Sequence, residues 1–182
     1  AKFAQNGAPL WGKQLAVEAS AGVSPAVLAD HSIVLSGSFT GTINWTGEDL
    51  TSVGGTDIVV LKLDETGEVV WARQFGSGGL DAGSAQADGS GGFFLGASSD
   101  GSIDFGGGTL FSAGGYDAFL ARFDKDGNHL WSRRFGGTSK DLASMSVNRL
   151  SGDIALTVTA SAAYDLGAGP FEVFGTGDIV VA

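Results

Sequence analysis

The pattern of apolar and polar positions along the chain is one of short apolar runs separated by turn residues. The run at 117–123 is followed by a polar turn and a second apolar run that contains Trp131. The same order stands sixty residues earlier, over 57–71, and the chain opens within a third copy over 1–11. A fourth copy starts at Asp178. Because a fixed period is the signature of a repeat architecture, the chain is predicted to hold three periods.

Each period contains four segments with the alternation and flanking turn signals of β-strands. The first is small and polar, as at 82–88, and the second is strongly apolar, as at 92–96. The third is the run at 117–123, and the fourth, at 129–135, contains the tryptophan. We therefore expect one domain, residues 1–182, with approximate repeats 1–60, 61–120 and 121–182, each with four antiparallel strands.

The long connection between the second and third strands keeps an apolar-polar-apolar core in register, at 43–45, 103–105 and 164–166. A disordered loop would not conserve this spacing between copies, so each connection is predicted to form a small extra hairpin that folds back onto its sheet. In the second copy the glycines at 106–108 are its predicted turn.

Apolar residues occupy both faces of the third strand. Phe119, Ala121 and Phe123 point one way, and residues 118, 120 and 122 the other. A sheet that is apolar on both faces is covered on both sides, as in sheets stacked around an axis. A basic residue recurs at one position of this strand and is predicted to lie at the rim with its stem buried and its charge in water: Lys2, Lys62 and Arg122.

The composition fits an all-β chain, with 31 glycines and three prolines. The net charge of −10, without a basic cluster, argues against a nucleic-acid partner. The absence of cysteine excludes a disulfide framework and thiol chemistry, and no apolar run is long enough to span a membrane as a helix. The chain begins inside a strand pattern without Met, which is typical of a mature fragment or an excerpt.

The order Asp-x-Phe-Leu-Ala-Arg-Phe-Asp-x-x-Gly from Asp117, then Leu-Trp, Phe-Gly-Gly and a Gly-Asp-Ile-Ala-Leu strand, resembles the bacterial seven-bladed β-propeller repeat family, the SBBP repeats. The resemblance covers essentially the whole chain and implies β-propeller blades, secretion or display at the cell surface, and no catalytic residues. The first copy departs from it, since Ala4 replaces the aspartate of one turn and His31 the glycine of another.

Three blades form an incomplete ring, because closed propellers have at least four. Further blades are expected from a longer chain or from a second copy by self-assembly. The alternative fold is a β-trefoil-like closed three-fold domain, although the Gln-x-Trp typical of that fold is missing from this sequence.

Residues shared by all copies are interpreted as structural repeat markers. Trp11, Trp71 and Trp131, each two residues before a lysine or arginine, fit packing between blades, with sugar stacking as the alternative. Asp57, Asp117 and Asp178 open the third strand and fit turn caps or ion pairs, with a cation-collecting ring of carboxylates as the alternative.

The turn at 124–128 has the alternating oxygen ligands of a calcium loop in Asp124, Asp126 and Asn128. The equivalent turns at 64–68 and 4–8 lack this set, so a glycine-containing hairpin turn explains all three copies better. The prediction is no cofactor and no metal, with these three residues as weak calcium candidates.

No repeated catalytic group is evident, since His31 and His129 fall in turns and have no histidine equivalents. The connections between blades, at 76–81 and 136–141, share one face with the long second-to-third loops. Its nearest titratable residues make no convincing acid-base pair: Asp81, Asp100, Lys140 and Asp141.

The leading hypothesis is a non-enzymatic scaffold or protein-interaction module that binds any partner on this loop face. The first alternative is a carbohydrate-binding lectin with repeated sites in the clefts between blades. The second is part of a hydrolase or lyase whose central site needs further blades.

Overall fold

A computed structural model of the chain describes residues 1–15, 21–160, 164–165, 169–171 and 178–181. Within these residues every regular element is a β-strand, and every paired strand is antiparallel to its neighbour. The all-β prediction is therefore confirmed. None of the described sheets closes on itself. The strand orders alone do not distinguish propeller blades from a trefoil.

Two four-stranded sheets form the centre of the molecule, and each follows the predicted four-strand order. The first sheet has the order β3-β4-β7-β8 and the second β9-β10-β13-β14. The bounds of the first are Ala21–Val27, Ile33–Phe39, Asp57–Leu63 and Val69–Phe75. Those of the second are Asp81–Ala87, Phe93–Ser99, Asp117–Phe123 and His129–Phe135.

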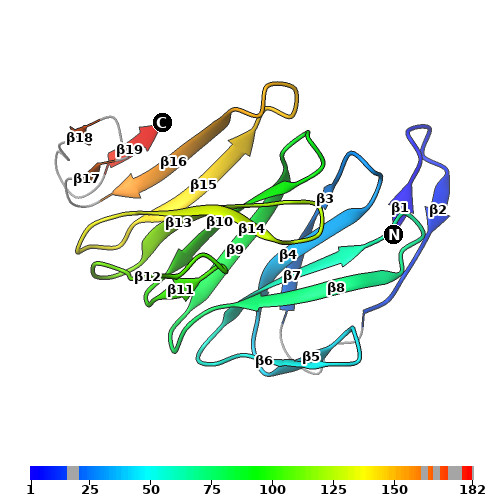
Figure 1. Ribbon diagram of the computed structural model, residues 1–182, viewed down its shortest axis with the longest axis horizontal. Helices are drawn as coiled ribbons and strands as arrows, with labels where there is room; N and C mark the ends of the chain where they lie inside the picture. Colours follow the sequence, from blue (N-terminus) through cyan, green and yellow to red (C-terminus); the bar gives the residue numbers. More distant parts are fainter. Residues whose placement is uncertain (16–20, 161–163, 166–168, 172–177, 182) are drawn as a thin grey trace.

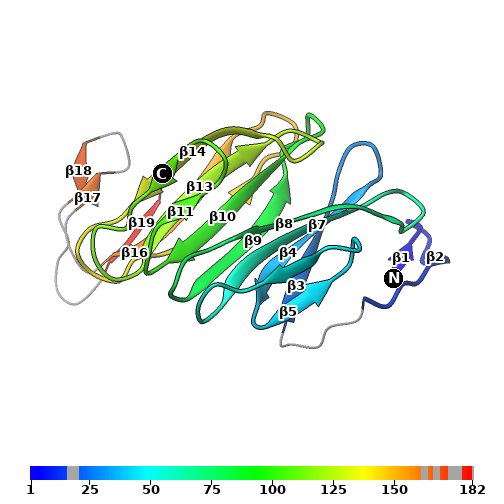
Figure 2. The same cartoon turned by 60° about the horizontal axis from the view of Figure 1, so that its bottom comes forward.

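The remaining strands continue the same pattern toward both ends. The third sheet contains β15 (Leu142–Val147), β16 (Ile154–Ala160) and β19 (Asp178–Val181), and an N-terminal hairpin pairs β1 (Lys2–Phe3) with β2 (Pro9–Trp11). The three sheets succeed one another along the long axis, from β1 and β2 at one end to β17–β19 at the other (Figures 1 and 2).

The predicted extra hairpins are present as two-stranded sheets in the long connections. They comprise β5 and β6 (Thr42–Asn44, Asp49–Thr51), β11 and β12 (Ile103–Asp104, Thr109–Leu110), and β17 and β18 (Tyr164–Asp165, Pro170–Phe171). The first two fold back onto their sheets, because Ile43 packs with Phe39 and Val59, and Ile103 and Phe105 enter the central core.

The sixty-residue repeat extends to the register of the strands. Ile33 pairs with Leu63 in the first sheet, and Phe93 pairs with Phe123 in the second. The third and fourth strands also share one irregularity, a shift of register just after the recurring basic residue, at Lys62 and at Arg122. A bulge kept at one position of a repeat is a built feature of the fold.

The core lies between consecutive sheets, as the two apolar faces of the third strand predict. Phe119, Ala121 and Phe123 pack toward the first sheet, with Ile58 and Val60 of β7. On the other face, Ala118 and Leu120 pack with the third sheet. The small first strand permits close approach, since a Cβ atom on Gly83 would lie 3.2 Å from the Ile58 side chain. The second sheet is thus covered on both faces, by the first sheet on one side and by the third on the other.

Candidate functional site

The predicted loop face forms where each sheet passes to the next. A parallel bridge joins Thr56 to Leu80, and Gly55 N donates to Gly79 O at 2.8 Å. At the next passage Gly115 N donates to Thr138 O at 3.4 Å. We define the loop face as the segments 52–56 and 76–80 and their equivalents 112–116 and 136–140. These segments fix the start of the third strand of one sheet beside the start of the first strand of the next.

This arrangement brings Asp57 and Asp81 together at the first junction, which joins the first and second sheets. Both residues are fully buried. Asp57 Oδ2 accepts hydrogen bonds from Gln74 Nε2 and, at 3.2 Å, from Val53 N. Asp81 Oδ2 accepts from Ser77 N at 2.7 Å. The Oδ1 atom of each carboxylate has no hydrogen-bond partner, so two buried carboxylate oxygens are left without donors.

The second junction, between the second and third sheets, repeats this geometry with different chemistry. Asp117 is fully buried, and its Oδ2 accepts from Ala113 N and from Arg134 Nη1, both at 2.7 Å. Asp141, also fully buried, accepts from Gly137 N at 2.9 Å. A Cβ atom on Gly136 would lie 2.5 Å from Asp117 Oδ1 and 2.9 Å from Asp141 Oδ2, so both carboxylates reach one point above this glycine.

Burial raises the pKa of the Asp81 carboxyl above its ordinary value. The charges of Asp57 and Asp100 act in the same direction, against the opposing effects of Ser99 and Ser77. This direction is expected, because burial and a nearby like charge both disfavour ionisation of a carboxyl group.

The other titratable residues predicted on the loop face have local partners. Asp100 is exposed, and its Oδ1 accepts from Leu80 N at 2.8 Å. Lys140 Nζ lies 5.0 Å from the centre of the Tyr116 ring. No group of three or more His, Cys, Asp or Glu side chains suited to a metal occurs among the residues that the structure describes.

Two of the repeated tryptophans contact the turn between the third and fourth strands of the next sheet. Trp11 lies against Gly67, where an added Cβ would approach its ring to 3.0 Å, and its Nε1 donates to Glu65 O at 2.8 Å. Trp71 lies in the same way against Gly127 and stacks on Phe93 at 6.2 Å between ring centres.

The basic residue two positions after the tryptophan differs in its contacts between the copies. Arg73 lies over the Trp71 ring at 5.6 Å, whereas Lys13 pairs with Glu68 at 3.0 Å. Trp131 packs near Phe94, with 6.0 Å between the ring centres.

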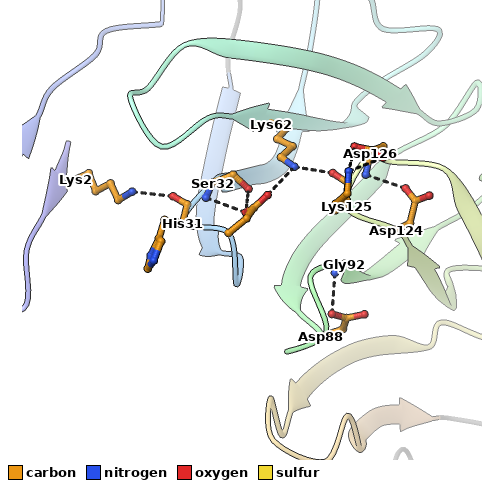
Figure 3. Close-up of polar contacts among 10 residues, drawn as sticks. Lys2, His31, Ser32, Lys62, Asp88, Gly92, Asp124, Lys125 and Asp126 are labelled. Carbon is orange, nitrogen blue, oxygen red and sulfur yellow. Dashed lines mark hydrogen bonds and ion pairs between the residues drawn. The ribbon is translucent and has the colours of Figure 1, made fainter.

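The recurring basic residues of the third strand reach hairpins at the opposite rim, and Figure 3 shows Lys2 and Lys62 among them. Lys2 Nζ donates to His31 O at 2.7 Å, and Lys62 Nζ donates to Lys125 O at 2.7 Å and lies 3.4 Å from Asp30 Oδ2. Arg122 pairs with Asp88 at 2.9 Å. The prediction that the charged group lies in water is wrong for Lys62. Its side chain is only 8 % exposed, because the 124–128 turn of the next sheet covers it.

The calcium candidates form an ordinary capped turn in this structure. Asp124 Oδ1 accepts from the backbone N of Asp126 and of Asn128 at 2.8 and 2.9 Å, and its Oδ2 accepts from Asn128 Nδ2 at 2.9 Å. Asp64 caps its turn in the same way, accepting from Thr66 N and Glu68 N. The repeated turn therefore explains the oxygen pattern without an ion, and the metal prediction itself stays untested.

The remaining predicted residues lie apart from the junctions. His129 Nε2 lies 3.0 Å from Ser132 Oγ, and His31 occupies a hairpin turn. Asp178 begins β19, where its backbone pairs with Ala160 as that of Asp117 pairs with Ser99. Thus the structure gathers the aspartates of the sheet junctions and leaves the histidines, the tryptophans and the 124–128 turn elsewhere.

The sequence did not predict that Asp57 and Asp81 lie close together. The available signal was that Asp81 and Asp141, like Asp57 and Asp117, recur at the sixty-residue period.

A groove of about 390 Å³ runs along the small first and second strands of the first two sheets. Its lining is rich in hydroxyl groups and backbone: Ser24, Ser36, Ser38, Ser84 and Ser98. The groove offers hydrogen bonds to a polar ligand but no charged side chain.

The chain matches no protein-family model, and no curated protein is significantly similar to it. The resemblance to the SBBP repeats thus stays a prediction from the residues. The part of the chain that the structure describes contains no helix long and apolar enough to cross a membrane.

Proposed function

We propose that the chain is a run of blades from a bacterial β-propeller, secreted or displayed at the cell surface, that acts as a non-enzymatic scaffold and protein-interaction module. The support from the fold is the stacking of consecutive sheets with one repeated register. The repeated tryptophans and rim lysines support it too, because Trp11, Trp71 and Lys62 contact the turn of the following sheet.

The observation that carries the interaction role is the exposure of large apolar side chains around the loop face. Val53 is 71 % exposed, Leu80 47 % and Phe111, at the end of the second extra hairpin, 71 %. Apolar side chains gathered near one face of a soluble domain mark surfaces that contact other proteins. Val53 and Leu80 belong to segments that run side by side, since a bridge joins Thr56 to Leu80.

Electron microscopy of the purified assembly tests the scaffold. A β-propeller predicts ring-shaped particles with a central channel, completed by a second copy or by the rest of a longer parent chain. A compact monomer in which the three sheets close around a three-fold axis would instead support the trefoil-like alternative.

Site-specific photo-crosslinking tests the interaction role. A photoreactive residue at Phe111 is expected to capture protein on the surface of the producing cells. The same group at Leu150, which is fully exposed in the hairpin turn between β15 and β16, is the matched control and is expected to capture little. Equal capture at both positions would contradict a specific loop-face contact.

A glycan array distinguishes the lectin alternative. Repeated sugar sites between blades would use the tryptophans as stacking platforms. Trp11 and Trp71 instead lie against Gly67 and Gly127, which leaves less of each ring for a sugar. We therefore expect no glycan binding, and binding that is lost in Trp11→Ala and Trp71→Ala would favour the lectin.

A further inference from the structure

The two sheet junctions contain equivalent acidic pairs but unequal countercharge. At the second junction the guanidinium of Arg134 donates to Asp117 Oδ2 and also to Gly136 O, at 2.7 and 3.0 Å. The residue sixty positions earlier is Gln74, whose neutral amide donates to Asp57 Oδ2. Among the described ion pairs, none includes Asp57 or Asp81. The first junction therefore buries two carboxylates with no basic partner.

Such a pair is unstable as it stands. Two carboxylates taken out of water without a countercharge lose hydration and repel each other, and proteins neutralise them with a cation or a proton. Both side chains are fully buried, and each has one oxygen without a hydrogen-bond partner. Asp117 Oδ1 at the second junction also accepts no hydrogen bond, so the missing positive charge is what sets the first junction apart.

We propose that the first junction binds a hard divalent cation of the Ca²⁺ class between Asp57 and Asp81. The second junction shows that a positive charge fits beside such a pair, because there the guanidinium of Arg134 donates to Asp117 Oδ2, whereas the neutral Gln74 amide donates to Asp57 Oδ2. Carboxylate and backbone carbonyl oxygens are the ligands that Ca²⁺ prefers, and water completes its coordination where protein ligands are few.

The close packing of the loop face supports this assignment. A Cβ atom on Gly76 would lie 2.5 Å from Asp57 Cγ, so the backbone of the connection presses directly on the carboxylate. Ser77, the next residue, donates its N–H to Asp81. A cation held by both aspartates therefore joins the third strand of one sheet to the first strand of the next and stabilises the stacking of sheets. With two carboxylates, the dissociation constant is expected at roughly 10⁻⁴–10⁻³ M, the range of weak extracellular calcium modules.

Thermal unfolding tests the proposal, in metal-free buffer and with 10 mM CaCl₂ against NaCl of matched ionic strength as the control; that calcium concentration is on the order of ten to a hundred times the expected dissociation constant. For the unaltered chain, Ca²⁺ is expected to raise the unfolding temperature by about 3–8 °C. Titration calorimetry with CaCl₂ at a constant pH near neutrality should give one site on each chain.

The decisive variant is Gln74→Arg, which gives the first junction the chemistry of the second. It is expected to unfold at a higher temperature without Ca²⁺ and to lose most of the response to Ca²⁺. Leu130→Arg adds the same charge at an exposed position of β14 and is expected to keep the full response. Asp124→Asn, in the 124–128 turn, should also keep it.

The proposal is overturned if Ca²⁺ has no more effect than NaCl on the unaltered chain, or if Gln74→Arg responds as strongly as the unaltered chain. Loss of the response in Asp124→Asn would overturn it as well, because the ion would then belong to the hairpin turn. Since Gln74→Arg removes no buried group, its result does not depend on whether Asp57→Asn or Asp81→Asn can fold.

Discussion

The first and second junctions have the same backbone arrangement, but different side-chain interactions hold their sheets together. The first is rich in aromatic side chains, with five phenylalanines in its core: Phe75, Phe93, Phe105, Phe119 and Phe123. The second has one buried phenylalanine, Phe94, among smaller buried residues such as Leu120 and Met145, and it contains the ion pair of Arg134 with Asp117. A sixty-residue repeat can thus fix strand order and register while leaving the stabilising interactions free to differ from one junction to the next.

Truncation of neighbouring residues of β13 gives the largest test of this difference. Phe119 faces the first junction and Leu120 the second. Phe119→Ala is expected to lower the free energy of unfolding by about 3–5 kcal/mol, because it empties the aromatic core, and Leu120→Ala by about 2–4 kcal/mol. Urea denaturation measures both, with exposed Leu130→Ala as the control at about 0.5 kcal/mol or less. A larger loss in Leu120→Ala would reverse the ranking of the two junctions.

Arg134→Gln converts the second junction to the chemistry of the first. Asp117 is fully buried, so the loss of a charged donor leaves its carboxylate poorly compensated, although Arg134 itself is 31 % exposed and partly screened. The free energy of unfolding is expected to fall by about 1.5–3 kcal/mol. Arg133→Gln, at an exposed neighbour, should change it by about 0.5 kcal/mol or less. Equal effects of the two substitutions would show that the ion pair does not stabilise the junction.

Much of this fold is predictable because it depends on local pattern. Alternation along 117–123 assigns Phe119 and Leu120 to opposite faces, and the repeat locates the strands and the extra hairpins. The identity of the faces that meet is also predictable, because a strand that is apolar on both faces must be covered twice.

The candidate site is less predictable because it depends on how consecutive sheets are placed. Asp57 and Asp81 belong to different strands of different sheets, and the sequence shows that each recurs but not that they meet. The same holds for Lys62, whose backbone partner at Lys125 belongs to the next sheet. Strand periodicity assigns a face and leaves partners across a sheet interface undetermined.

The first two sheets differ less in the stabilisation that their rim ion pairs provide, and this difference depends on pH. Burial tends to raise the pKa of Asp88, but its hydrogen bonds with Arg122 and Ser90 outweigh burial and hold the pKa below its ordinary value of 3.8. A depressed carboxyl pKa means that the unfolded chain binds the proton more readily. The stabilisation is therefore complete well above pH 3.8 and is lost as the pH falls through the lower folded value.

Asp88→Asn is thus expected to cost about 1–2 kcal/mol at pH 7 and progressively less below pH 4. The matched substitution in the first sheet is Asp30→Asn. Its carboxylate also has a lowered pKa, owing first to the hydrogen bond from the Ser32 hydroxyl, but it is 46 % exposed. It should therefore cost less, at about 0.5 kcal/mol. Urea titrations of both variants between pH 3 and pH 7 measure the contrast, which fails if the two profiles coincide.

The smallest contrast is in the first hairpin of each sheet, where His31 takes the place that glycine holds in the other copies. His31 has φ of +64°, and Gly91 and Gly152 have +111° and +79°, so the backbone keeps the left-handed turn whichever residue is present. That conformation crowds the Cβ of an L-residue, whereas glycine has none. His31→Gly is expected to raise the free energy of unfolding by about 0.5 kcal/mol, since relief of strain exceeds the added freedom of the unfolded chain.

The reverse substitution, Gly91→Ala, measures the cost of placing a residue with a Cβ atom in the left-handed conformation. A Cβ atom on Gly91 would meet no other atom within 4 Å, so any loss of stability in Gly91→Ala comes from the dihedral angle alone. We expect a loss of about 1 kcal/mol by urea denaturation. The contact of Lys2 with His31 is unaffected by His31→Gly because it is made to the backbone carbonyl. If His31→Gly destabilised the chain while Gly91→Ala behaved as expected, the imidazole would be making a contribution that its turn geometry does not explain.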